Sequence, residues 1–152
     1  MKERHLFRRI VFWLYCVLML YLLFFQHRMP FLSEGTYLLT LQRNLNYIPG
    51  DTIRRFYHLL LYYPGYRRAA VINLFGNIVM FIPLGFCLPW VHARLRRWWK
   101  TLLVSAGVIL CVELTQLVTL LGHCDVDDLI LNLIGVTMGY LLWAITFGHK
   151  GN

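Results

Sequence analysis

Four of the seven acidic residues in this 152-residue chain lie close together, at Glu113, Asp125, Asp127 and Asp128. Carboxylates can transfer protons, hold a divalent cation or accept hydrogen bonds from a ligand. Glu113 lies inside an apolar run, where a charged group is costly unless it is paired or hydrated. This clustering therefore predicts a functional site.

A polar stripe runs along the apolar segment that follows Cys124. It consists of Asp125, Asp128, Asn132, Gly135 and Gly139, spaced three, four, three and four residues apart. That spacing puts all five on one face of a helix. The two glycines would let a neighbouring backbone approach closely. Asp127 falls off the stripe, and we expect it to face solvent.

Further polar residues interrupt two other apolar runs. Gln116 follows Glu113 on the same helix face, and Asn73 and Asn77 share a face in an earlier run. At 1.5 Å per residue, Asn77, Glu113 and Gln116 lie about 8 to 12 Å below the outer ends of their helices. Asp128 and Asn132 lie about 5 and 10 Å below theirs. We therefore expect one shared polar pocket that opens outward.

Simpler interpretations of the same residues remain open. Asn and Gln inside membrane spans often only join neighbouring helices. Asp125 stands near an expected helix start, where a carboxylate can cap the helix. An unpaired Glu113 is harder to explain in this way, because its burial in lipid is costly.

The composition sets the class of protein that positions these residues. Hydrophobic residues make up 59% of the chain and charged residues 14%, against about 25% charged residues in a soluble domain. This excludes an ordinary soluble globular protein. We expect a single all-α membrane domain over residues 1–152, with four transmembrane helices at about 10–25, 71–91, 101–121 and 125–147.

The basic residues predict the orientation. Nine Lys and Arg flank the two termini and the 92–100 loop, whereas the 122–124 turn has none and the 26–70 loop has six. The positive-inside rule then places both ends in the cytoplasm. The outer loop of about 45 residues contains 52–63, an amphipathic segment typical of an interfacial helix.

Charge and cysteine usage exclude several other classes. The net charge of +8 comes from residues at the ends of apolar runs, so we expect contacts with membrane lipids and not with nucleic acid. The four cysteines form no Cys-x-x-Cys pair, and three of them lie in apolar runs. We expect no disulfide, no metal site and no cofactor.

Four motifs follow one another along the chain. They are Asn46-x-x-Pro49 with Arg43 just before it, Asn77 ahead of Phe81-x-Pro83-x-Gly85, Glu113-x-x-Gln116, and Asp125-x-x-Asp128-x-x-x-Asn132-x-x-Gly135. In this order they resemble the VanZ-like family of membrane proteins over about residues 43–140. The resemblance implies a multi-pass protein of the bacterial plasma membrane. It also implies that Arg43 and Asn46 belong to the ligand-binding set with the polar residues of the spans.

This chain departs from the family pattern at two places. Gly50 stands where many relatives have Phe, and His123-Cys124 stands where many have an Arg before the first Asp. A cation that could pair with Asp125 is then missing from that turn, so Arg43 or Arg67 would have to supply it.

The resemblance and the pocket together suggest a function in the cell envelope. The family's named member is associated with teicoplanin resistance, and we expect binding of a lipidated glycopeptide or a lipid-linked cell-wall precursor in the outward pocket. Alternatives are an intramembrane acid–base or cation-dependent enzyme using Glu113, Asp125 and Asp128, and a small proton-coupled exporter. A further alternative is an assembly protein that forms homo-oligomers through Gly135 and Gly139.

Overall fold

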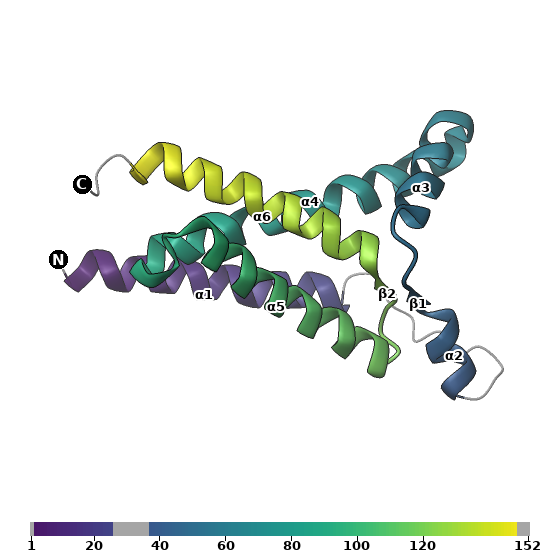
Figure 1. Ribbon diagram of the computed structural model, residues 1–152, viewed down its shortest axis with the longest axis horizontal. Coiled ribbons are helices and arrows are strands. Elements are labelled where there is room, and N and C mark those ends of the chain that lie inside the picture. The colour runs from purple at the N-terminus through teal and green to yellow at the C-terminus, as the bar shows by residue number, and fades with distance from the viewer. Residues whose placement is uncertain (1, 26–36, 149–152) are drawn as a thin grey trace.

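The computed structural model describes residues 2–25 and 37–148, which are mostly helical (Figure 1). Within these residues, four helices are long and apolar enough to cross a membrane. They are α1 (Lys2–Phe25), α4 (Arg67–Val91), α5 (Trp98–Val118) and α6 (Val126–Phe147). The predicted all-α, four-span architecture is confirmed.

The helices differ from the predicted spans at their ends. α1 begins at Lys2 instead of residue 10, so the first span is not short. α4 begins at Arg67, directly after the 3-10 turn η1 (Pro64–Tyr66). Basic and aromatic residues are compatible with helix and with the membrane interface, so apolar runs underestimate helix length at these ends.

The non-spanning segments gather mainly at the end of the bundle away from both termini (Figure 1). They are α2 (Tyr37–Arg43), β1 (Leu45–Asn46), α3 (Asp51–Tyr62) and β2 (Cys124–Asp125), whereas the short η2 (Ala93–Leu95) joins α4 to α5. The predicted interfacial helix corresponds to α3. The two short strands were not predicted.

α4 and α6 are in backbone contact along their length. A Cβ on Gly135 would overlap the carbonyl oxygen of Ile78, and one on Gly139 would overlap that of Ile82. Gly85 of α4 approaches the backbone of α6 in the same way. The close approach expected from the glycines therefore occurs within the chain, so assembly through Gly135 and Gly139 would have to displace α4.

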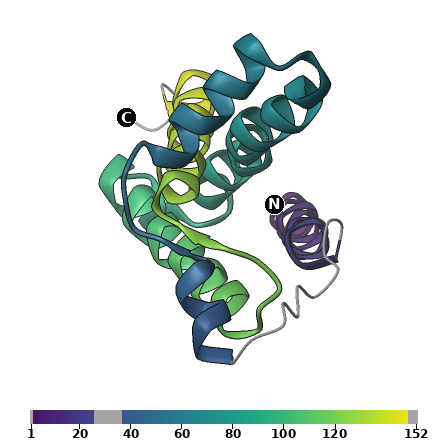
Figure 2. The same cartoon turned by 90° about the vertical axis from the view of Figure 1, so that its right-hand side faces the viewer.

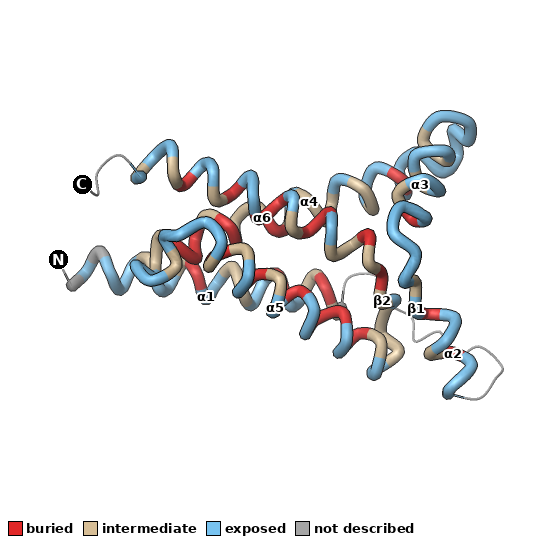
Figure 3. Tube along the Cα trace, viewed as in Figure 1, coloured by how far each residue is buried: buried red, intermediate tan, exposed pale blue. Residues whose placement is uncertain are grey.

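Buried residues face the inside of the bundle (Figure 3). Exposed apolar side chains also cover its outside. Phe81, Ile109 and Val136 are fully buried. Leu14 of α1 and Ile145 of α6 are exposed. Exposed apolar residues on every spanning helix are expected for surfaces that contact lipid.

α1 stands partly apart from the other three spans, as the view along the bundle shows (Figure 2). The hydroxyl of Tyr15 donates to the carbonyl of Met80 in α4 at 2.9 Å. The amide Nε2 of Gln116 in α5 donates to the carbonyl of Leu23 at 3.1 Å. These bonds fix α1 beside the bundle and leave a groove between α1 and α4.

Candidate functional site

The predicted site residues fall into two sets in the structure. The outer network joins α3, α5, β1 and the start of α6, and it contains Asn46, Thr52, Glu113, Asp125 and Asp127. The groove lies between α1 and α4 and contains Asn73, Asn77 and Asp128 among its lining residues. The lining of the groove does not include Asn46, Glu113, Gln116, Asp125 or Asn132, and one pocket shared by all the predicted residues stays a prediction.

Asp125 is the centre of the outer network. Its buried carboxylate accepts from Thr52 Oγ1 at 2.5 Å and from Asn46 Nδ2 at 3.2 Å. It also accepts from the backbone N–H of Asp127 at 2.8 Å and so caps α6. The capping interpretation is correct, and the same carboxylate additionally ties the outer loop to α6. Three donors satisfy much of the desolvated charge.

Asp127 is fully buried, so the expectation that it faces solvent is wrong. Its two carboxylate oxygens accept from the backbone N–H groups of Gly50, at 2.6 Å, and Ile53, at 3.0 Å. Those groups belong to the amino end of α3, where no local side chain caps the helix. The carboxylate therefore caps α3 from another helix, at the end where the helix dipole favours negative charge.

Gly50 makes this capping geometry possible. Its φ of 87° lies in the left-handed region, which glycine adopts without steric cost. The left-handed backbone explains why a glycine suits this position.

The pairing of β1 with β2 positions the outer network. The two strands are parallel, with Leu45 opposite Cys124 and Asn46 opposite Asp125. The backbone N–H of Cys124 also donates to the carbonyl of Asn44 at 2.8 Å. This register places the side chain of Asn46 beside the carboxylate of Asp125.

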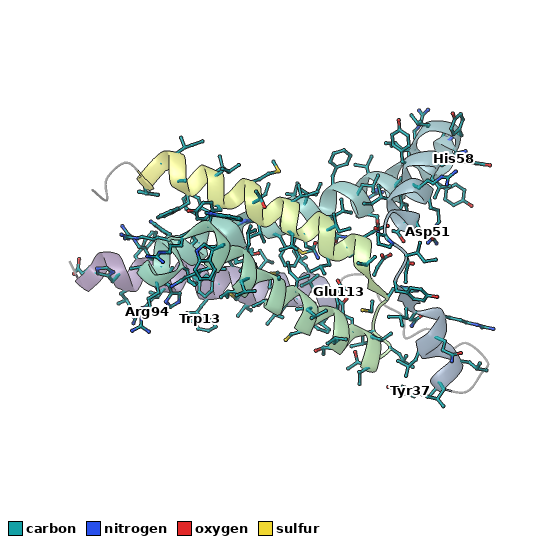
Figure 4. All side chains as sticks on the ribbon, viewed as in Figure 1. Trp13, Tyr37, Asp51, His58, Arg94 and Glu113 are labelled. Carbon is teal, nitrogen blue, oxygen red and sulfur yellow. The ribbon has the colours of Figure 1, made fainter. Side chains whose placement is uncertain are left out.

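Glu113 reaches the outer network from α5 (Figure 4). It is buried, and its Oε2 accepts from the backbone N–H of Asp125 at 3.4 Å. Burial and then the charges of Glu113, Asp125 and Asp128 raise the pKa of the nearby Cys124 thiol. A protonated thiol is a poor nucleophile, so the raised pKa makes Cys124 less reactive than an ordinary thiol.

The groove has a volume of about 960 Å³ and is mostly apolar. α1 contributes Tyr15, Leu18, Met19, Leu22 and Leu23. The polar lining is Arg68, Asn73 and Asn77 of α4 together with Asp128 of α6. Asn77 Nδ2 donates to Asp128 Oδ1 at 2.5 Å, so α4 and α6 present their polar groups together.

Two further asparagines have unsatisfied oxygens. Asn73 Oδ1 and Asn132 Oδ1 are buried and accept no hydrogen bond within the described residues. Asn73 lines the groove, whereas Asn132 is only 2% exposed and lies inside the bundle. A buried acceptor without a partner is uncommon in folded proteins.

Three residues that the sequence suggested for the site belong neither to the outer network nor to the lining of the groove. Gln116 is buried and joins α5 to α1, so it has a structural contact. Arg43 is exposed at the end of α2. Arg67, the other suggested cation, donates from Nε to the carbonyl of Leu60 at 3.1 Å.

The chemistry of the donor set limits what the site can hold. Within residues 2–25 and 37–148, no group of three or more His, Cys, Asp or Glu is arranged to bind a metal ion. The oxygens of Asp125 and Asp127 are occupied by protein donors. The outer network is therefore built to join segments, and the groove offers the space for a ligand.

Sequence reasoning missed Thr52, Gly50, Asp127 and Arg68. For Asp127 no signal was present, because Asp51 and Thr52 are themselves typical capping residues and the structure alone shows that no local side chain caps α3. Arg68 directly precedes an apolar run in the outer loop, where its charge was counted only for topology. Thr52 carried no signal beyond its place at a helix start.

Comparisons with known proteins agree with this architecture. No curated protein and no solved structure matches the chain. A family model described as VanZ/LLP1 matches residues 12–147. The matched region includes most of α1, the outer segments and the three other spans, and therefore both the outer network and the groove. On this match, which covers nearly the whole chain, the protein belongs to the VanZ/LLP1 family.

Proposed function

We propose that this protein acts in the bacterial plasma membrane as a VanZ-type envelope protein and binds a lipid-linked or lipidated ligand in the groove between α1 and α4. The observation that carries the proposal is the division of the groove into an apolar wall and a polar lining. Apolar atoms make up most of the surface that borders the groove. An amphipathic ligand matches such a surface, and a wholly polar one does not.

The polar lining would receive the head of the ligand. Arg68 provides a guanidinium, which binds phosphate or carboxylate through two parallel hydrogen bonds. The buried Oδ1 of Asn73 would accept a hydroxyl or amide donor. A phosphate or carboxylate next to hydroxyl or amide groups, as in lipid-linked sugars or acylated glycopeptides, satisfies both requirements.

The apolar wall would receive the acyl chain. Leu18, Met19 and Leu22 of α1 line one side, and Val79 and Met80 of α4 line the other. Each buried CH₂ group contributes about 0.8 kcal/mol.

The outer network would support binding indirectly. Asp127 and Asp125 hold α3 in place through Gly50, Ile53 and Thr52. Phe56 of α3 lines the groove at the same end as Arg68. Glu113 and Asp125 would then act as positioning residues, because they fix the helix that closes the outer end of the groove.

The first test measures binding directly. The full-length protein is purified in a mild detergent, and copurifying lipids and added teicoplanin are quantified by mass spectrometry. We expect Arg68→Gln to retain much less ligand than the wild type, and Asp128→Asn to retain less because Asp128 orients the amide of Asn77 in the groove. Arg67→Gln is the matched control, because Arg67 carries the same charge on the neighbouring residue and does not line the groove.

The second test measures the phenotype in a host where the wild-type protein confers teicoplanin tolerance. Expressed Asp128→Asn and Glu113→Gln variants should lose it while inserting normally, because removal of a charge makes insertion easier. A glycopeptide without an acyl tail should show no such difference. Full wild-type tolerance in both variants, with unchanged ligand retention, would reject the binding proposal.

The enzyme alternative is favoured by one observation only. Asp128 lines the groove, so it is the acidic residue best placed to transfer a proton to a bound head group. Conversion of the retained lipid by the wild type but not by Asp128→Asn would establish this alternative. The exporter and assembly alternatives have no comparable support from the contacts described.

A further inference from the structure

A second cavity lies at the opposite end of the bundle, where both termini are found. It has a volume of about 470 Å³ and lies among α1, α4, the turn after η2 and α6. Its lining includes Arg8, Trp90, Arg96, Tyr140, Ala144 and Phe147. This inner cavity shares no residue with the groove, so an inference about it is independent of the proposed function.

The inner cavity is surrounded by hydrogen-bond donors. The guanidinium of Arg8 lies over the Trp90 ring, with Cζ 5.1 Å from the ring centroid, and Nη1 donates to the Trp90 carbonyl at 3.4 Å. Arg96 is exposed, and its backbone carbonyl accepts from the Tyr140 hydroxyl at 2.7 Å, which fixes the turn against α6. The Nε1–H of Trp90 is buried without an acceptor in the described part of the chain.

Negative charge is scarce at this end. Of the acidic residues that the structure describes, Glu3 alone belongs to it, and Glu3 lines an adjacent depression with Phe7, Arg8 and Trp90. The remaining described acids lie in α3, α5 and the start of α6, toward the outer network. The two guanidinium groups in the lining therefore give the inner cavity a net positive charge, which favours an anionic ligand.

The walls of the inner cavity indicate where that anion comes from. Trp90 and Phe147 stack with their ring centroids 6.4 Å apart and an interplanar angle of 27°. Next to these rings, the small side chain of Ala144 lines the inner cavity. Aromatic walls next to basic residues at the end of membrane-spanning helices suit the boundary between head groups and acyl chains. A free inorganic anion has no apolar part that could contact these walls.

We propose that the inner cavity is a binding site for the phosphate head group of an anionic phospholipid. Arg8 and Arg96 bind the phosphodiester, and Trp90 and Phe147 contact the glycerol and upper acyl carbons. The positive-inside rule places this end on the cytoplasmic side, where basic pockets between spans bind anionic lipid. The site would add to the contacts of α1 with the bundle, which include the core residues Phe12, Met19 and Leu23.

The proposal is tested with the full-length protein by native mass spectrometry, with phosphatidylglycerol or phosphatidylcholine added to delipidated samples. We expect selective phosphatidylglycerol binding that weakens about tenfold in Arg96→Gln. Ala144→Phe fills the cavity without changing charge and should weaken binding at least as much. Arg94→Gln removes an equal charge from η2 outside the cavity and should bind like the wild type.

Three results would overturn the proposal. Equal losses in Arg94→Gln and Arg96→Gln would show general surface attraction instead of a site. Equal binding of the two phospholipids would show that the head-group charge is not recognised. Complete competition by millimolar inorganic phosphate would show a free-anion site. A thermal unfolding curve for each variant confirms that the protein compared is folded, and Arg96→Gln removes no hydrogen bond made by the described residues.

Discussion

Asp127, in the first turn of α6, caps the amino end of α3 by accepting the backbone N–H of Gly50 at 2.6 Å. The two residues are 77 positions apart in the chain. A second bond from Ile53 makes the carboxylate bidentate. This buried side chain, together with Asp125, thus holds the start of α3 against the start of α6.

Asp127→Asn should destabilise the protein by about 1–3 kcal/mol, because it replaces one of two required acceptor oxygens with a donor. The measurement is the thermal unfolding of purified protein, together with the rate of proteolysis within residues 44–66. The control is Asp51→Asn, whose exposed ion pair with Arg55 contributes about 0–1 kcal/mol. Equal stability of the two variants would contradict the capping role.

Gly139→Ala should be strongly destabilising. Its Cβ would overlap the carbonyl oxygen of Ile82, so α4 and α6 would have to separate at a cost of about 1–3 kcal/mol or more. Gly107→Ala is the matched control, because a Cβ at Gly107 has no atom within 4 Å. Alanine also favours a helix over glycine by about 1 kcal/mol, so this control should match or exceed wild-type stability. A wild-type melting temperature for Gly139→Ala would contradict the observed packing.

The reactivity of Cys124 should depend on pH and on Glu113. Because burial and neighbouring carboxylates raise its pKa above the ordinary 9.0, the thiolate that reacts with maleimides is scarce near neutral pH. Glu113→Gln should lower the pKa and accelerate alkylation, as followed by peptide mass spectrometry, whereas Asp51→Asn should not.

The same shift has a defined effect on stability. A raised pKa means that ionising the thiol costs more in the folded protein than in the unfolded chain. The free energy of unfolding therefore falls as the pH rises above the ordinary pKa of the thiol. Below that pH the thiol is protonated in both states and stability does not depend on it.

Alkylation of Cys124 at equal rates in the wild type and Glu113→Gln would show that the two groups do not interact.

Alkaline phosphatase fused after residue 45 should be active, and the same enzyme fused after residue 96 should be inactive. The reason is the excess of Lys and Arg beside the termini and the 92–100 loop, which favours their retention in the cytoplasm. Both fusion points lie between described helices, at β1 and after η2. The reverse pattern of activity would place the groove on the inner side and the inner cavity on the outer side.

The sequence predicted the parts of the structure that depend on local periodicity. Apolar runs identified the four spans, and the three-and-four spacing of Asn132, Gly135 and Gly139 identified part of the buried face of α6. The depth estimate put Asn77 and Asp128 at similar levels, and their side chains are hydrogen-bonded. These features follow from helix geometry and need no knowledge of distant contacts.

The remaining features depend on contacts between distant residues. Asn46 and Asp125, which are 79 positions apart, meet because two-residue strands pair, and strands this short have no periodic pattern. Asp127 was misjudged because its distance from the stripe was equated with exposure to water. In fact α3 covers that side of α6, which no pattern within α6 reveals.

The pairing of β1 with β2 also sets the order in which the protein can mature. Chains are synthesised from the amino end, so residues 37–66 emerge well before the carboxylates that hold them. Until Asp125 and Asp127 arrive, α3 lacks the side chains that cap its first turn and bind Thr52. The contacts that hold the outer segment therefore cannot form until the last span has been inserted at the membrane.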